Sequence, residues 1–457
     1  MLTYGEALQA LAERGRFGIR LGLGRTRALL RELGHPEREF RGALIGGTNG
    51  KGSVVALIGS ALRAAGLRAG ETPKPHLVSY RERLQIGGQP IDAATFARLT
   101  GTVLPIADRV ARRAGEPTEF ELLTAMMFRW FADESVDLAV VEVGLGGRLD
   151  ATHAWDGGVA TITNVDLDHM DRLGPTVTAI AREKAAIIVR GDRAVTGATG
   201  DGLVVIRRRA RRVGVALVEV TPAPLLGLDR DGISVEVTGL GATRVGLRGR
   251  HQAANVAVAD ATLDALAAAG IAAVPAAARR RGYADARWPG RLEIVTVDGR
   301  DIVLDGAHNP AGAATLATAL DDLRPYLAAE RDDRDPEAPL TLVVASMADK
   351  DVDGVIAALV RAAALRRATV ICTALDLARA LPADALAGRW SAVTAVTAVG
   401  GGLRIVAEAD VDTALDRALS EARGPIVVCG SLYLVGRARA RLVDDPLLRD
   451  PEEPPIR

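Results

Sequence analysis

The feature that most constrains the fold of this sequence is a glycine-rich segment at residues 46–53, Gly46-Gly47-Thr48-Asn49-Gly50-Lys51-Gly52-Ser53. It follows an apolar run at residues 43–45 and precedes residues 54–62, which have helical spacing. A strand, a glycine loop and a helix together are typical of a phosphate-binding loop, because glycines let backbone N–H groups face an anion at the positive end of the helix. Lys51 would then reach the β- and γ-phosphates, and the Ser53 hydroxyl would bind Mg²⁺.

The usual pattern places a serine or threonine directly after the lysine, whereas Gly52 separates Lys51 from Ser53 in this sequence. The alternative interpretation is a glycine-rich turn with a solvated lysine. The preceding strand and the following helix favour a nucleotide site.

Apolar runs alternate with helical patterns along the chain, which predicts an α/β fold with a parallel sheet. Residues 137–143 and 158–164 are expected as buried strands, and residues 4–14, 25–33, 93–114 and 119–133 as helices. We expect a P-loop ATPase-type N-terminal domain at residues 1–287, with a β-rich piece at about 203–247. After a linker at residues 288–291 we expect a smaller Rossmann-like α/β domain to residue 440 and an irregular tail at 441–457.

Composition excludes several classes of protein. The formal net charge is +0 over 457 residues, so no overall field draws the chain to nucleic acid or to an anionic membrane. An arginine cluster at residues 207–212 lacks interleaved aromatic residues and is expected to be a solvated helix face. Cys372 and Cys429 are expected to be buried thiols. No signal segment or membrane-spanning stretch is evident, so a cytoplasmic protein is expected.

Carboxylates and a histidine follow two of the predicted strands. Glu142 ends the first strand and precedes a glycine-rich segment that contains Arg148. Ligands bind at the carboxyl ends of parallel strands, so Glu142 is a candidate Mg²⁺ ligand, and pairing with Arg148 is the alternative. After the second strand, His169 follows Asp166 and Asp168 and could bind a second metal, or could be structural.

Two further groups have both a chemical and a structural interpretation. Lys184 enters an apolar run, where burial would lower its pKa and a neutral amine could take up CO₂ as a carbamate. A surface lysine with a buried stem is the alternative. In the second domain, Asp305 and His308 follow a strand and could contact a nucleotide or a substrate, or form a turn that caps the next helix.

Seven motifs together resemble folylpolyglutamate synthase/dihydrofolate synthase, a family of the Mur ligase superfamily. The resemblance extends from about residue 19 to residue 436, and the glycine-rich motif after Glu142 is highly specific. The motifs occupy residues 47–53, 142–152, 167–169, 181–184, 288–293, 305–310 and 430–436.

The resemblance implies a Mur ligase-like, ATP-dependent amide ligase that joins L-glutamate to dihydropteroate or to a reduced folate through an acyl phosphate, in a monomeric protein. It implies two Mg²⁺ ions held by Ser53, Glu142 and His169, and a carboxylated Lys184, so that Lys51, Lys184, His169 and Glu142 are the expected catalytic groups. The implied ATP contacts are Asn49, Gly50, Lys51, Gly52, Ser53, Asn255, Arg291, Asp305 and His308. The implied pterin contacts are Arg20, Leu21, Gly22, Leu23, Thr118, Glu119, Phe120, Leu149, Asp150 and Ala151.

Three positions depart from the family pattern. Lys74 stands where many members have a metal-binding serine, Arg20 where an aspartate is often found, and His153 in place of a frequent asparagine. The rival interpretations are a synthase that glutamylates only folates, a Mur-type ligase acting on a UDP-sugar peptide, and a nucleotide switch. Mur-type ligases normally carry an additional N-terminal domain, whereas about forty residues precede the glycine loop here.

Overall fold

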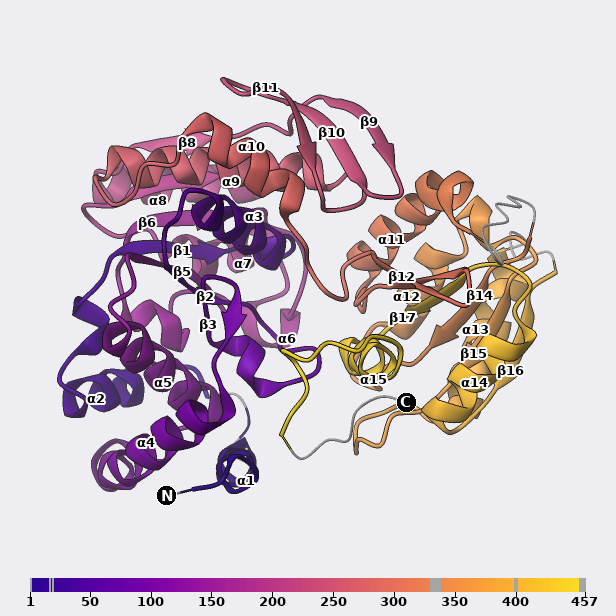
Figure 1. Ribbon diagram of the computed structural model, residues 1–457, viewed down its shortest axis with the longest axis horizontal. Coiled ribbons are helices and arrows are strands. Elements are labelled where there is room, and N and C mark those ends of the chain that lie inside the picture. Colours follow the sequence, from indigo (N-terminus) through magenta and orange to yellow (C-terminus); the bar gives the residue numbers. More distant parts are fainter. Residues whose placement is uncertain (1, 16–17, 19, 329–337, 398–401, 452–457) are drawn as a thin grey trace.

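The computed structural model describes residues 2–15, 18, 20–328, 338–397 and 402–451, and they form two α/β halves, each built around its own main sheet (Figure 1). The predicted fold class is therefore confirmed, with a mainly parallel sheet in the N-terminal half and a second sheet in the C-terminal half. Our predicted residue limits for the domains stay a proposal.

The N-terminal sheet has eight strands in the order β4-β3-β2-β5-β1-β6-β7-β8. The six strands from β2 to β8 in that order are parallel, and β3 and β4 add an antiparallel edge. The chain leaves β1 toward β2 on one side and later reaches β6 on the other side, so a topological switch point lies at the carboxyl end of β1. The strands are β1 Gly42–Gly46, β2 Ala69–Thr72, β3 Gln85–Ile86, β4 Gln89–Pro90, β5 Leu138–Glu142, β6 Gly158–Ile162, β7 Arg193–Thr196 and β8 Leu217–Glu219.

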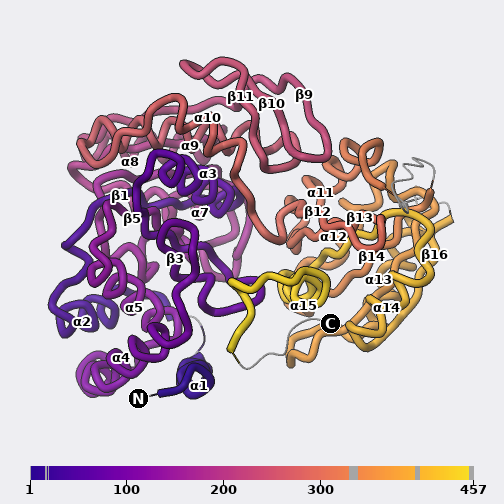
Figure 2. The backbone as a smooth tube through the Cα atoms, in the orientation of Figure 1, coloured from indigo at the N-terminus to yellow at the C-terminus, as the bar shows by residue number. Residues whose placement is uncertain are grey.

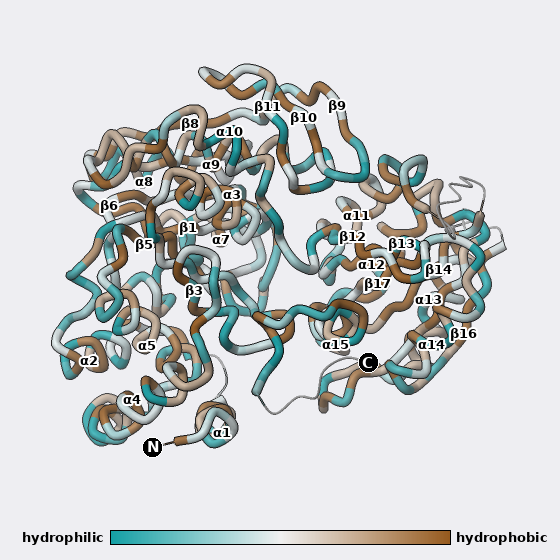
Figure 3. The backbone as a smooth tube through the Cα atoms, in the orientation of Figure 1, coloured by the Kyte–Doolittle hydropathy of each residue, from teal (hydrophilic) through white to brown (hydrophobic). Residues whose placement is uncertain are grey.

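Two hydrophobic cores cover the two faces of this sheet. One core packs α1, α2, α4 and α5 against the sheet, and the other packs α3, α9 and α10. Figure 3 shows hydrophobic residues along strands of both sheets, for example near β5 and β13. The helices are α1 Tyr4–Gly15, α2 Gly24–Glu32, α3 Lys51–Ala64, α4 Ala93–Ala114, α5 Glu119–Asp133, α6 Met170–Leu173, α7 Val177–Ala185, α8 Gly200–Val213, α9 Gln252–Ala268 and α10 Ala276–Asp285.

The β-rich piece is shorter than expected from the sequence. Residues 203–213 belong to the helix α8, and β8 joins the main sheet. The buried residues of α8 are Gly202, Ile206 and Ala210, and the arginine cluster at residues 207–212 lies on this helix, as expected. A separate antiparallel sheet contains only β9 Leu225–Asp229, β10 Gly232–Val237 and β11 Gly241–Val245.

The second sheet has six strands in the order β12-β13-β17-β14-β15-β16, parallel except for the edge strand β12. Apolar runs at residues 302–304, 340–345, 369–373 and 425–429 predict strands, which the structure forms as β13, β14, β15 and β17. No pattern predicts β12 or β16, which lie at the two edges. The buried thiols Cys372 and Cys429 are confirmed. The elements are β12 Glu293–Val297, β13 Arg300–Leu304, β14 Thr341–Val344, β15 Thr369–Cys372, β16 Arg404–Ala407, β17 Ile426–Cys429, α11 Pro310–Leu323, α12 Val352–Leu359, α13 Ala383–Thr397, α14 Val411–Glu421 and α15 Leu432–Leu442.

The two halves face each other across a boundary that the chain crosses twice. It crosses first after α10, and after α15 the C-terminal segment turns back toward the N-terminal half (Figure 2). Five short 3₁₀ turns complete the described structure, at Pro36–Arg38, Tyr80–Arg83, Ala151–Ala154, Arg324–Tyr326 and Ala363–Leu365. Among the residues described, no helix combines the length and the apolar character needed to cross a membrane.

Candidate active site

The glycine loop lies between the end of β1 and the start of α3, as the sequence predicted. Gly47 has φ 144° and Gly50, the N-cap of α3, has φ 81°, a region that favours glycine. A Cβ at Gly47 would lie 1.9 Å from Thr163 Oγ1, and one at Gly50 would lie 2.3 Å from Asn255 Oδ1. Both glycines are therefore required by backbone conformation and by close neighbours.

The side chain of Lys51 folds back onto its own loop. Its Nζ donates to Gly47 O at 3.1 Å and to Thr48 O at 2.9 Å. The loop is held from the next strand, because Asn49 N donates to Asn164 Oδ1 at 2.9 Å. Lys51 Nζ therefore lies at the loop, where a bound anion can accept the hydrogen bonds that Nζ donates to these two carbonyls.

The unusual glycine between Lys51 and Ser53 has a steric explanation. A Cβ at Gly52 would lie 2.4 Å from a ring carbon of Trp288, in the linker to the second half of the chain. Ser53 is buried and accepts from Gln252 Nε2 at 3.4 Å, and Asn255 Nδ2 donates to Gln252 Oε1 at 2.8 Å. The tryptophan contact, which sequence reasoning missed, ties the phosphate loop to the linker.

Glu142 lies at the end of β5, beside the glycine loop, because Ile45 of β1 is its register partner. Its carboxyl group is buried, and burial raises its pKa, whereas the charges of Lys51 and Lys74 lower it. The alternative pairing with Arg148 is wrong, because Arg148 Nε lies 2.9 Å from Glu183 Oε1. Glu142 is therefore a carboxylate held among cations without a dedicated arginine partner.

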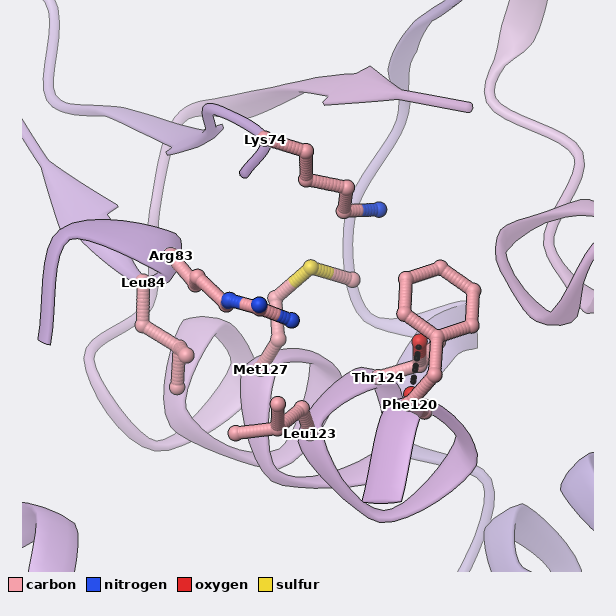
Figure 4. Close-up of a pocket in the computed structure, with 7 residues that line it drawn as sticks. All are labelled: Lys74, Arg83, Leu84, Phe120, Leu123, Thr124 and Met127. Carbon is pink, nitrogen blue, oxygen red and sulfur yellow. Dashed lines mark hydrogen bonds between the residues drawn. The ribbon is translucent and has the colours of Figure 1, made fainter. Parts of the chain in front are cut away.

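Lys74 holds Glu142 at two points. Its backbone N donates to Glu142 Oε2 at 3.0 Å, and its Nζ donates to Glu142 O at 2.7 Å. Burial lowers the pKa of Lys74 to about 8, against the raising influence of Asp150 and Glu142. Nζ also lies 4.7 Å from the centre of the Phe120 ring, within the range of a cation–π contact. A cavity of about 10 Å³ adjoins this contact and is lined by Lys74, Arg83, Leu84, Phe120, Leu123, Thr124 and Met127 (Figure 4).

Lys184 is buried at the glycine loop, so the alternative of a surface lysine is wrong. Its residue is 5% exposed, and its Nζ donates to Gly47 O at 2.8 Å. Burial, and after it the charge of Lys51, lowers the pKa of Lys184 to about 7. The amine is therefore available in its neutral form near neutral pH, which is the form that reacts with CO₂.

His169 follows β6 at the N-cap of the short helix α6. Its Nε2 lies 3.8 Å from Asp168 Oδ2. Burial lowers the pKa of His169, the charge of Asp168 raises it, and those of Lys350, Lys51 and Lys184 lower it. Among the described residues, no three His, Cys, Asp or Glu side chains gather into a metal-binding group. Glu142 and His169 therefore do not form a protein-only metal cage.

Asp305 follows β13 and is engaged in its own turn. Its Oδ2 accepts from Leu292 N and its Oδ1 from Ala307 N, both at 2.9 Å. Burial raises the pKa of Asp305, and Arg291 opposes this shift. Asp305 therefore forms a turn, as one of the two interpretations expected, but it does not cap the next helix, because the N-cap of α11 is Asn309. The charge of Arg291, in the linker, lowers the pKa of both Asp305 and Glu142.

His308 and Lys350 come from the second half of the chain, and the pKa of His308 responds to charges in both halves. His308 Nδ1 lies 2.8 Å from Gly306 O. Burial lowers the pKa of His308, and among the charges that act on it are Lys350 and, across the boundary, Asp168. The charge of Lys350 lowers the pKa of both His308 and His169, and no sequence pattern indicated this influence.

The segments expected to bind the pterin lie beside one another. Gly22 N donates to Leu149 O at 3.1 Å, which joins the segment with Arg20, Leu21 and Leu23 to the segment after β5. Arg20 has an exposed side chain, and its carbonyl accepts from Arg25 Nη2 at 2.9 Å. These two segments therefore lie next to each other, as the sequence analysis expected.

Two of the expected pterin contacts use their polar atoms for local structure. Thr118 caps α5 through a reciprocal capping box with Glu121. Asp150 is buried, its Oδ1 accepts from Thr152 and its Oδ2 from Leu145 N at 2.8 Å. Of the others in this set, Glu119 and Phe120 are half-buried and Ala151 is buried. His153 Nδ1 lies 3.2 Å from Arg148 O, within the same turn.

Comparisons with known proteins cover nearly the whole chain. Residues 45–263 match the Mur ligase middle domain, and residues 291–440 match the C-terminal domain of dihydrofolate synthetase. A Bacillus subtilis dihydrofolate synthase/folylpolyglutamate synthase is 36% identical over 328 residues, which cover 70% of this chain and 76% of that protein.

Two solved structures resemble the described fold. Mycobacterium tuberculosis folylpolyglutamate synthase, complexed with ADP and AMPPCP, has a TM-score of 0.81 and 31% identity, over 98% of this chain and 100% of that one. Escherichia coli FolC, in complex with DHPP and ADP, has a TM-score of 0.78 and 28% identity, over 96% and 98% of the two chains.

Proposed function

Because the chain belongs to the dihydrofolate synthase/folylpolyglutamate synthase family, we propose that it is an ATP-dependent ligase that joins L-glutamate to a folate-type carboxylate. The acceptor is dihydropteroate, a reduced folate that already carries glutamate, or both. We further propose that residues 1–287 and 288–440 act as two domains that meet over the reacting groups, in a monomeric protein.

One observation carries this proposal. The glycine loop, Glu142 and Lys184 meet at the carboxyl ends of β1 and β5, and the charge of Arg291, in the linker, lowers the pKa of Glu142 there. Ligands bind at such a switch point in open α/β sheets. A nucleotide phosphate there would lie between a cationic loop on one domain and charged groups of the other.

The donor set fits a magnesium ion that arrives with the nucleotide. Mg²⁺ prefers oxygen ligands and usually combines one or two protein groups with phosphate oxygens and water. Glu142 and Ser53 supply such oxygens, and the neutral imidazole of His169 is a further donor at the same edge. The ion would neutralise charge on the phosphoryl group as that group moves.

The proposed reaction has two steps, and residues of the glycine loop would hold the phosphates during the first. First, the acceptor carboxylate attacks the γ-phosphorus, the bond to the β–γ bridging oxygen breaks, and an acyl phosphate and ADP form. The ammonium of Lys51 and the backbone N–H groups of residues 49–52 would hold the phosphates. Second, the amine of glutamate attacks the acyl carbon, which releases phosphate and forms the amide.

Lys184 would serve as a carbamate in this proposal. The buried amine, 2.8 Å from Gly47 O, would become an anion at the phosphate loop after reaction with CO₂. As an anion it would lie opposite Lys51 and could accept a proton or orient a cation beside the acceptor carboxylate. Closure of the two domains would exclude the water that hydrolyses an acyl phosphate.

Release of ADP tests the proposed function. The purified protein is incubated with ATP, Mg²⁺ and L-glutamate, and dihydropteroate or tetrahydrofolate is added in separate reactions. Release with both acceptors supports a bifunctional enzyme, and release with tetrahydrofolate alone limits it to a folylpolyglutamate synthase. Release with neither, but with a UDP-sugar peptide, would favour the Mur-type ligase. Slow hydrolysis of ATP, at a rate that none of the acceptors changes, would favour a nucleotide switch.

A further inference from the structure

The C-terminal segment at residues 443–450, here called the strap, returns from the second domain to the first. It leaves the end of α15 and runs back toward the N-terminal half in Figures 1 and 2. Arg439 of α15 holds its beginning, with Nη2 3.2 Å from Asp445 Oδ2 and Nε 3.0 Å from Glu293 Oε2. The strap is therefore tied to the second domain at one end.

The other end of the strap is tied to the N-terminal domain by Arg81 and Ser79. Arg81 is buried, and its Nη2 donates to Leu447 O at 2.9 Å and to Arg449 O at 2.7 Å. Asp450 Oδ1 accepts from Ser79 Oγ at 2.6 Å and from Arg81 Nε at 3.3 Å. A forked guanidinium that bridges two carbonyls and a carboxylate fixes direction as well as distance.

Ser79 and Arg81 belong to the turn that supports the segment at residues 74–79. Glu82 and Ser79 form a capping box. The Glu82 carboxylate accepts from Leu77 N at 3.0 Å, from Val78 N at 2.6 Å and from Ser79 N at 2.7 Å. Three backbone donors thus depend on one buried carboxylate, whose position depends on the turn that the strap holds.

The second domain also contacts this segment directly. A Cβ at Gly436 of α15 would lie 2.0 Å from Leu77 O, so the helix backbone touches the carbonyl. Lys74, at the other end of the segment, holds Glu142 through its backbone N at 3.0 Å and its Nζ at 2.7 Å. An unbroken series of contacts therefore joins α15 and the strap to the carboxylate at the phosphate site.

We propose that the strap is a positioning element of the active site: by holding Ser79 and Arg81 it fixes the segment 74–79, and through Lys74 it fixes Glu142. The orientation of the second domain is thereby coupled to a proposed Mg²⁺ ligand of the first. The role of Glu142 in this inference rests on the proposed function, whereas the positioning of the segment does not. Lys74 and Arg81 are positioning residues, since neither needs to touch the reacting atoms.

The test compares Asp450→Ala with a matched control, Asp353→Ala. Asp353 pairs with Arg389 at 2.6 Å on the surface of the second domain, away from the strap. Hydrogen exchange is followed by mass spectrometry in peptides that cover residues 74–82, without substrate. Loss of a charged hydrogen-bond partner is expected to speed exchange there about tenfold in Asp450→Ala, with no change in the control.

Steady-state kinetics provide the second measurement. We expect Asp450→Ala to lower kcat about three- to tenfold at saturating ATP, with a similar melting temperature in both variants. Arg81→Lys keeps the positive charge but loses the forked guanidinium, so it should also lower kcat. The effects of Arg81→Lys and Asp450→Ala on kcat should be less than additive in the double variant. Unchanged exchange in residues 74–82, or an equal rise throughout the N-terminal domain, would overturn the inference. If the wild-type chain ligates nothing but the exchange still responds, the proposed function fails and the positioning stands.

Discussion

Replacing Lys184 with methionine should stabilise the fold at neutral pH while it removes ligation. The ammonium is almost completely buried, and its pKa is lowered from 10.5 to about 7, chiefly by burial and then by Lys51. At about 1.4 kcal/mol for each pH unit between those two values, the lowered pKa of Lys184 corresponds to about 5 kcal/mol of lost stability. Methionine has a similar length and no charge, and Gly47 O keeps its contact with Lys51 at 3.1 Å.

The sign of this effect follows from proton linkage. The folded pKa is lowered, so between about pH 7 and 10.5 the unfolded chain binds more protons than the folded chain at this residue. The wild-type protein therefore gains stability as the pH rises through that window. The methionine variant lacks this gain, so its advantage should be largest at pH 7 and below, and should disappear near pH 10.5.

Urea unfolding in CO₂-free buffer, followed by tryptophan fluorescence, measures the difference between the two proteins at pH 6, 7, 9 and 10.5. Part of the 5 kcal/mol is offset by the lost hydrogen bond, so an advantage of about 2–4 kcal/mol is expected at pH 7. In parallel, the variant should bind ADP but release no ADP with acceptor and glutamate. If the free energy of unfolding of the variant exceeds that of the wild-type protein by the same amount at every pH, then Lys184 is not desolvated. That result would remove the basis for the proposed carbamate.

Three further predictions concern other parts of the chain. Gly52→Ala should displace Trp288 and raise the KM for ATP tenfold or more, because the added Cβ would lie 2.4 Å from the ring, and ADP-release kinetics measure this. Glu142→Gln should lower kcat about a hundredfold and weaken the dependence on Mg²⁺, which a metal titration of the rate detects. Arg279→Met should cost about 3 kcal/mol in urea unfolding, because it leaves Asp260, 3.0 Å away, as a buried carboxylate without its ion pair.

Helix periodicity and buried apolar runs were sufficient to predict α1 to α5 and the central strands β1, β5 and β6 of the N-terminal half, but not β2, β3, β4, β7 or β8. The predicted helices at residues 93–114 and 119–133 have the bounds of α4 and α5. The residues before these helices, Asp92 and Thr118, are their N-caps, and their side chains accept hydrogen bonds from backbone N–H groups of the first turn. The edge strands β12 and β16 escaped prediction, because partly exposed strands lack the continuous apolar run that buried strands show.

The candidate site was predictable where a single segment determines the chemistry. The glycine loop, Glu142 and Lys184 each carried a local signal, and the structure brings them together. Contacts between distant segments had no such signal. Tertiary packing places Trp288 against Gly52 and gives Lys74 its two hydrogen bonds to Glu142. It also brings the charge of Lys350 to act on the pKa of His169. A side chain's position in the sequence cannot reveal a partner that only the fold supplies.

The two lysines at the glycine loop depend on each other through one carbonyl oxygen. Lys51 Nζ lies 3.1 Å and Lys184 Nζ 2.8 Å from Gly47 O, and the charge of Lys51 helps to lower the pKa of Lys184. A nucleotide phosphate would draw Lys51 away from that carbonyl and so weaken the influence that keeps Lys184 neutral. Reaction with CO₂ requires the neutral amine and produces an anion that Lys51 would stabilise. In the proposed reaction, the carbamate on Lys184 would therefore form before the phosphates arrive, and the nucleotide would bind to a loop whose second lysine is already an anion.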